Sequence, residues 1–305
     1  MTIITRTSTF ASFNQLLGNV NRVQTSLFDS QNQLSSGLKT DSFEGFAGQV
    51  EQFVSLEAKI RTVVNYQENN AQNVSRLRTT SETLSALIDR VDDMENLMVN
   101  RRNPATGEDL AFGQQMTSLI SAMRAELNLT FEGKFLFSGT RTNTPPVPDP
   151  VTPPVTTGVP DAGYYQGSQT DITLRADDDV EFAYRVRADN SAFQKAFAAA
   201  YESIEADAVD PFDDEMMISA IDLLQEAKDE MIALQATVQS DIVAMENIAQ
   251  RQNSLELYWA GVTEELSRTD ILAVSTKLAV DETVLQASFQ AFASINSLRL
   301  VNFLN

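Results

Sequence analysis

The fold is decided by residues 53–98, which run FVSLEAKIRTVVNYQENNAQNVSRLRTTSETLSALIDRVDDMENLM. Two rows of mostly apolar residues repeat here every seven positions, and together they alternate at spacings of three and four. They are Leu56, Val63, Asn70, Leu77, Leu84, Val91 and Met98, and Phe53, Ile60, Gln67, Val74, Ser81, Ile88 and Glu95. This spacing is typical of the seam of a left-handed coiled coil, so it predicts one long helix.

Three further blocks outward from this stretch show the same periodicity. Pro211, followed by three acidic residues, marks the start of the longest, because acids suit the first turn of a helix. Its two rows are Leu224, Met231, Val238, Met245, Gln252, Trp259 and Leu266, and Ala227, Leu234, Asp241, Ile248, Leu255 and Val262. The first block carries Phe13, Val20, Leu27 and Leu34 with Leu16 and Val23, and the last carries Ile271, Leu278, Leu285 and Phe292. We therefore expect a mainly α fold, a long antiparallel coiled-coil bundle forming a rod, with its terminal helices paired.

The pattern changes between the two long blocks. Residues 134–139 alternate like a short strand, residues 144–158 are rich in proline, and strands are expected at 171–175 and 180–186 around an acidic turn. A small β-containing insertion is therefore expected at one end of the rod. The predicted organisation is 1–45 N-terminal assembly helix, 46–133 N-terminal part of the rod, 134–210 insertion, 211–267 C-terminal part of the rod, and 268–305 C-terminal assembly helix.

Composition excludes several kinds of function. The 305 residues include 22 Lys and Arg against 42 Asp and Glu, a net charge of −20 that disfavours nucleic acid as a partner. Histidine and cysteine are both absent, which excludes Ser-His and Cys-His catalysis, disulfides and zinc sites of His/Cys type. No apolar run reaches the roughly 18 residues of a membrane span, and the start lacks a Sec-type signal. We expect no enzyme activity, no cofactor, no metal site and no membrane partner.

Polar groups at two places allow alternative interpretations. Residues 177–179 are three aspartates, which could bind a hard cation or form a solvated hairpin turn; without EF-hand spacing the turn is favoured. The polar seam residues are either ordinary imperfections of the bundle or buried groups that fix its register. They are Gln67, Asn70, Asp241 and Gln252.

Both terminal segments are helical in pattern and carry little charge. A lone helix of that composition would expose an apolar stripe, so each end needs a partner. The two ends either pack together within one subunit or make a heterologous contact repeated between subunits, which builds an open polymer.

These ends resemble the flagellin superfamily. Its amino-terminal signature appears as Gln33-Leu-Ser-Ser-Gly37 and then Asp41 to Gly48, and its carboxy-terminal signature as Thr269-Asp-Ile271, Leu285-Gln-Ala-Ser288 and a leucine-rich end. Within the superfamily, residues 133–140, 142–146 and Tyr165-Gln-Gly167 are similar to the hook-associated, hook–filament junction class. The pair Phe43-Glu44, where filament flagellins carry an Asp-Asp-like pair, further disfavours a filament subunit.

The resemblance implies a structural subunit of the extracellular flagellum, exported unfolded through the flagellar type III channel without a cleaved Sec signal. The implied partners are further copies of itself in an open helical or ring assembly, another hook-associated protein, flagellin and an export chaperone. The alternatives are a flagellin, a type III translocator or needle-tip protein, and, more distantly, a polysaccharide-cleaving enzyme. The residues that the resemblance marks for assembly are Gln33, Leu34, Ser35, Ser36, Gly37, Ala47, Gly48, Thr269, Asp270, Ile271, Leu285, Gln286, Ala287, Ser288, Leu298, Leu300, Phe303 and Leu304.

Overall fold

The computed structural model describes residues 3–39, 48–103, 107 and 111–304. The chain divides into two compact units, which are described separately. The terminal unit comprises residues 1–62 and 255–305, and the central unit comprises residues 63–254. The helices are α1 Ile3–Ser36, α2 Val50–Arg101, α3 Phe112–Leu127, α4 Ser191–Ala208, α5 Asp214–Ser267 and α6 Ile271–Leu304. The expected mainly α class is confirmed.

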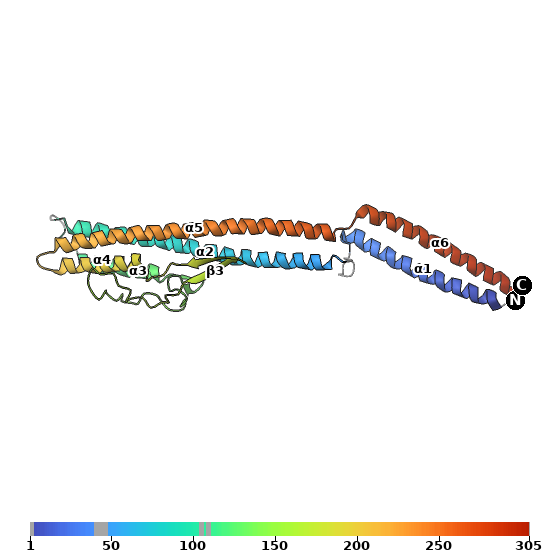
Figure 1. Ribbon diagram of the computed structural model, residues 1–305, viewed down its shortest axis with the longest axis horizontal. Coiled ribbons are helices and arrows are strands. Elements are labelled where there is room, and N and C mark those ends of the chain that lie inside the picture. Colours follow the sequence, from blue (N-terminus) through green and yellow to red (C-terminus); the bar gives the residue numbers. More distant parts are fainter. Residues whose placement is uncertain (1–2, 40–47, 104–106, 108–110, 305) are drawn as a thin grey trace. The chain divides into compact units, whose positions relative to one another are not determined.

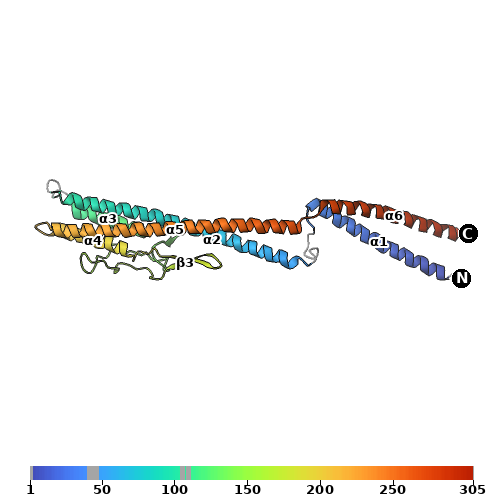
Figure 2. The same cartoon turned by 45° about the horizontal axis from the view of Figure 1, so that its top comes forward.

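Helices α2 and α5 lie side by side in the central unit and run antiparallel (Figures 1 and 2). Polar contacts show the direction, because positions that rise along α2 meet positions that fall along α5. Arg78 pairs with Glu246 at 2.6 Å, and Gln225 donates to Glu95 at 2.8 Å. The predicted seam is confirmed, since the row from Val63 to Met98 is at least nine-tenths buried throughout.

A third layer covers the α2–α5 pair in the central unit. Its helices α3 and α4 pack against each other, and α4 is capped by Asn190, whose side chain accepts a hydrogen bond from the Ala192 amide at 3.0 Å. A second row on α2, outside the two predicted heptad rows, is also buried. Its members are Thr80, Thr83, Leu87, Met94 and Leu97.

Two small antiparallel sheets accompany these helices. Strands β1 Thr130–Phe131 and β2 Lys134–Phe135 form one, so the strand expected over 134–139 is only two residues long. Strands β3 Ile172–Asp177 and β4 Val180–Tyr184 form the other, which confirms the predicted acidic hairpin.

The expected position of the β-containing insertion, at one end of the helical pair, is wrong for the β3–β4 hairpin. Asn70 of α2 and Gln252 of α5 both donate to the Ala176 carbonyl of β3, at 2.8 and 2.9 Å, and Asn70 also donates to Gln252 at 3.1 Å. All three residues are fully buried. The hairpin therefore lies along the flank of the pair, and these two polar seam residues attach it there.

Candidate assembly site

The candidate site in the terminal unit is the antiparallel pair of α1 and α6 (Figure 1). Phe13 and Phe292 have ring centroids 5.1 Å apart, and Ser26 donates to Asp281 at 2.7 Å. The α1 residues predicted to face a partner, from Phe13 to Leu34, are buried or half-buried, as are Leu278, Leu285 and Phe292 of α6. The expected pairing of the terminal helices within one subunit is thus confirmed.

A tight joint closes this pair where α1 ends and α6 begins. Gly37 takes a φ of +73°, a left-handed conformation that favours glycine, and its amide donates to the Gln33 carbonyl at 2.9 Å. The chain then forms a short antiparallel bridge between Leu38 and Arg268. The Thr269 amide donates to the Gly37 carbonyl at 2.9 Å. The two signature segments, more than 230 positions apart in the sequence, therefore meet directly.

The segment Thr269-Asp-Ile271 begins helix α6. Thr269 is buried, and the Asp270 carboxylate accepts hydrogen bonds from the amides of Leu272 and Ala273, both at 3.0 Å. Asp270 is thus the N-cap of α6, and its negative charge also suits the positive end of the helix dipole. Ile271 was expected to lie in step with Leu278, but its side chain is 59% exposed, so that expectation is wrong. It belongs to the first turn, outside the inward-facing row that starts at Val274.

The remaining predicted site residues fall into three groups. Gln33, Leu34, Leu285 and Ser288 are half-buried, whereas Ser35, Ser36, Gln286 and Ala287 are exposed. Gly48 has a φ of +93° just before α2, and Ala47 lies outside the described residues. The third group lies in the last part of α6, for which the structure describes the helix but not the side chains: Leu298, Leu300, Phe303 and Leu304.

Helix α6 carries a second apolar row beside the row that contacts α1. We call it the lateral stripe: Ala273, Val280, Val284, Ala287 and Ala291, all exposed. The exposed fractions of Val280 and Val284 are 54% and 42%. The stripe also has heptad spacing, from Ala273 to Val280 to Ala287 and from Val284 to Ala291, a signal that could have been recognised in the sequence. It gives α6 a face suited to a second helical partner.

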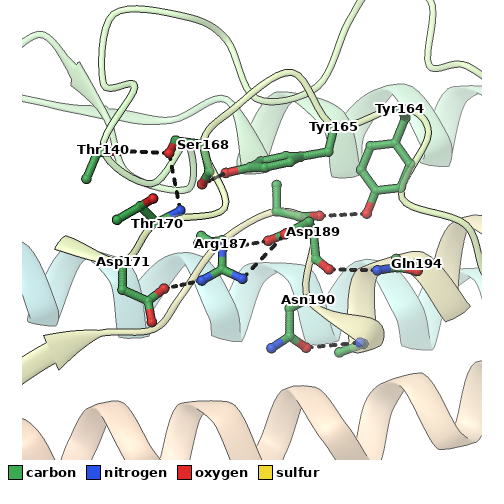
Figure 3. A network of polar contacts seen from close by, with 12 residues as sticks. Thr140, Tyr164, Tyr165, Ser168, Thr170, Asp171, Arg187, Asp189, Asn190 and Gln194 are labelled. Carbon is green, nitrogen blue, oxygen red and sulfur yellow. Dashed lines mark hydrogen bonds and ion pairs between the residues drawn. The ribbon is translucent and has the colours of Figure 1, made fainter.

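The junction-class motifs of the central unit lie against one another (Figure 3). The Ser168 amide, next to Tyr165-Gln-Gly167, donates to the Ser138 carbonyl at 2.8 Å. A Cβ atom at Gly139, where φ is +61°, would lie 2.1 Å from the Ser168 carbonyl oxygen. Gly139 is therefore needed for the close approach of these two backbone segments, which is a structural role.

Arg187 is the centre of the polar network drawn in Figure 3. It pairs with Asp189 at 2.8 Å and with Asp171, while Tyr164 donates to the Ala188 carbonyl at 2.6 Å. Burial raises the pKa of Tyr165 to about 12, and its hydroxyl donates to the Ser168 carbonyl at 2.8 Å. The network fastens the loops of the insertion to the start of α4.

The acidic hairpin turn is held by side chains of both long helices. Tyr66 of α2 donates to Asp178 at 2.8 Å, and Arg251 of α5 pairs with Asp177 at 2.9 Å. Across the described part of the chain, no group of three or more His, Cys, Asp or Glu side chains is arranged to hold a metal ion. None of the described helices is long and apolar enough to cross a membrane.

Comparison with known proteins supports the sequence resemblance. Residues 7–142 match the family described as the bacterial flagellin N-terminal helical region. The fold is similar to that of a putative flagellar hook-associated protein from Vibrio parahaemolyticus, with a TM-score of 0.59 and 14% identity over 71% of this chain and 96% of that one. It is also similar to FlgL from Bacillus cereus, with a TM-score of 0.56 and 17% identity over 70% and 99% of the two chains. No curated protein sequence matches. Residues 7–142 are thus similar to the bacterial flagellin N-terminal helical region, and the fold is similar to that of these two solved structures.

Proposed function

We propose that this chain is a structural subunit of the bacterial flagellum, a hook-associated protein that joins hook to filament and assembles through α1 and α6. The family match supports a flagellar structural protein, and the solved structures with a similar fold include a putative flagellar hook-associated protein and FlgL from Bacillus cereus. The observation that carries the proposal is the lateral stripe, because α6 is already paired with α1 and still exposes a heptad-spaced apolar row.

An exposed apolar row of this length is expected to be covered in the working state of the protein. A second copy of the chain can cover it through a heterologous contact, in which the two copies use different surfaces. Repetition of such a contact builds a ring or a helix of subunits. Charge favours the terminal unit for this contact. It carries 8 Lys and Arg against 11 Asp and Glu, whereas the central unit carries 14 against 31. Terminal units of neighbouring copies therefore repel each other less than central units do.

A filament flagellin is the second candidate, because the matching family is defined on flagellin. Complementation separates the two. We expect the gene to restore swimming to cells that lack their junction protein and not to cells that lack flagellin. Restoration of the flagellin-deficient cells alone would contradict the junction assignment.

The lateral stripe is tested by the double variant Val280→Asp/Val284→Asp. Both valines are on the surface of the subunit, so we expect normal folding by circular dichroism but no incorporation into flagella. Cells carrying it should build hooks, release flagellin into the medium and fail to swim. Val243→Asp in α5 of the central unit is the matched control, since that valine is 55% exposed but is not part of the stripe. Normal swimming of the double variant would refute assembly through this face.

A further inference from the structure

The terminal unit exposes three bulky apolar side chains in addition to the lateral stripe. Leu17 and Phe28 of α1 are 39% and 63% exposed, and Phe289 of α6 is 53% exposed. We call these three residues the knob face. Gln24, which is exposed between Leu17 and Phe28, adds no charge to it. The lateral stripe consists only of alanine and valine, so the two surfaces differ in the way that knobs differ from the shallow positions that receive them.

The knob face and the lateral stripe lie on opposite sides of the α1–α6 pair. Successive residues turn about a helix axis by about 100°. Viewed from the N-terminus of each helix, Leu17, Phe28 and Phe289 are displaced clockwise from the row that contacts the other helix, and the stripe is displaced anticlockwise. In an antiparallel pair, faces displaced in opposite senses lie on opposite sides. Ser26 and Asp281 support this geometry, because both are displaced anticlockwise and they meet at 2.7 Å.

Opposite placement decides what kind of contact can cover both surfaces. Neither surface can fold back onto the other within one subunit. A contact of stripe with stripe would stop at two copies and leave the knob face exposed. A heterologous contact, with the knob face of one copy on the stripe of the next, covers both surfaces and repeats without limit.

The spacing of the two surfaces also matches. Leu17 and Phe28 are 11 positions apart, which is about three helical turns. Ala273 and Val284 of the stripe have the same separation. When neighbouring copies point the same way, α1 of one copy runs antiparallel to α6 of the next. Phe28 then reaches Ala273 at the same time as Leu17 reaches Val284.

Charge favours this register. Ser26 and Asp281 are level with each other, which fixes how positions of α1 correspond to positions of α6 within one copy. With Phe28 against Ala273, Glu282 of the first copy comes level with Lys277 of the second to within about one residue, a rise of about 1.5 Å. Glu282 is exposed on the side of the knob face, and Lys277 is exposed on the side of the stripe. Two opposite charges therefore approach each other beside the apolar contact.

We propose that a second copy of this chain seats its knob face on the lateral stripe, with Phe28 against Ala273 and Leu17 against Val284. The inference rests on the assembly through α1 and α6 that is proposed above. It adds the surface that the neighbouring copy contributes and the register in which the two copies meet.

Engineered cysteines test this contact, because the natural chain has none. Flagella are isolated from cells that produce two versions of the full chain, one with Gln24→Cys and one, marked by an epitope tag, with Val280→Cys. These changes leave all three knobs in place, and the proposed register brings the two positions within about one helical turn. We expect a short thiol-specific cross-linker to give a mixed covalent dimer, and no dimer when every copy carries the same cysteine.

Ala291→Cys, used in place of Val280→Cys, is the matched control. It lies on the same stripe, about 20 Å from the expected level of Gln24, and should give no mixed dimer. A dimer formed by Val280→Cys alone would overturn the inference, since the stripe would then meet itself. Flagella that contain the chain but give no mixed dimer would overturn the inference and leave the proposed function standing. Absence of the chain from the flagella would overturn both.

A charge exchange tests the register in the same cross-linking assay. Lys277→Glu should lower the yield of the mixed dimer, and the further change Glu282→Lys should restore it. The two positions are about 140° apart around α6, so the restoring contact must come from another copy. An undiminished yield in the single variant, or an unrestored yield in the double variant, would overturn this register.

Discussion

Replacing Asp270 with alanine tests the helix cap that the carboxy-terminal signature provides. The substitution removes the side-chain acceptor of the amides of Leu272 and Ala273, each now bonded to Asp270 at 3.0 Å. Loss of an N-cap costs about 0.5–2 kcal/mol, and loss of the charge at the helix start adds about 0.3–1 kcal/mol. We therefore expect the first turns of α6 to open more easily by about 1–2 kcal/mol.

Hydrogen exchange of α6 amides measures this opening directly. A change of about 1–2 kcal/mol corresponds to about 5- to 30-fold faster exchange over Val274 to Leu278, with amides of the central unit unchanged. Asp270→Asn is the control, because asparagine accepts the same hydrogen bonds without the charge and should show the smaller part of the effect. Exchange in Asp270→Ala equal to that of the unaltered protein would show that the cap does not hold α6 to the joint.

Three other outcomes follow from the central core and its buried groups. Leu84→Ala should lower the free energy of unfolding by about 2–5 kcal/mol in chemical denaturation, because Leu84 is fully buried, whereas Leu257→Ala at 66% exposure should change it by less than about 0.5 kcal/mol. Burial raises the pKa of Glu202, so the native state binds this proton more tightly than the unfolded chain does and loses stability as pH rises through the raised pKa. Glu202→Gln should therefore raise the melting temperature at pH 7. This gain should disappear when the pH is below the ordinary pKa of glutamate. Gly139→Ala should destabilise by at least about 1–3 kcal/mol, since its Cβ would collide with the Ser168 carbonyl, and an unchanged melting curve would contradict that geometry.

The pairing surfaces of the long helices could be predicted because heptad spacing depends only on helix geometry. Leu77, Leu84 and Val91 are buried as expected, and the acidic hairpin forms where alternation and turn residues placed it. The meeting of the two signature segments also followed from the expected pairing of the chain ends. The contact itself, between Thr269 and Gly37, did not follow from periodicity.

The third layer of the central unit could not be derived from a two-row pattern. Leu87 and Met94 lie outside both rows, yet both are fully buried in the core that α2 shares with the other elements of the central unit. Nor does the spacing of Asn70 and Gln252 reveal their shared partner, because a backbone carbonyl such as that of Ala176 leaves no signal in the sequence. Their position in the seam indicated only that they would be buried.

The pairing of α1 with α6 has a consequence for the order of folding. Phe13 and Phe292 are nearly the whole chain apart, so the terminal unit has very non-local contacts and is expected to form slowly. Prior folding of the central unit shortens the loop that must close, because the contact between Asn70 and Gln252 then already holds α2 and α5 together. For the contact between Gly37 and Thr269, the loop to be closed falls from 232 residues to about 50. This is about two halvings of length, and each halving saves about 0.6 kcal/mol of closure entropy. Helix α1, although synthesised first, therefore acquires its partner last.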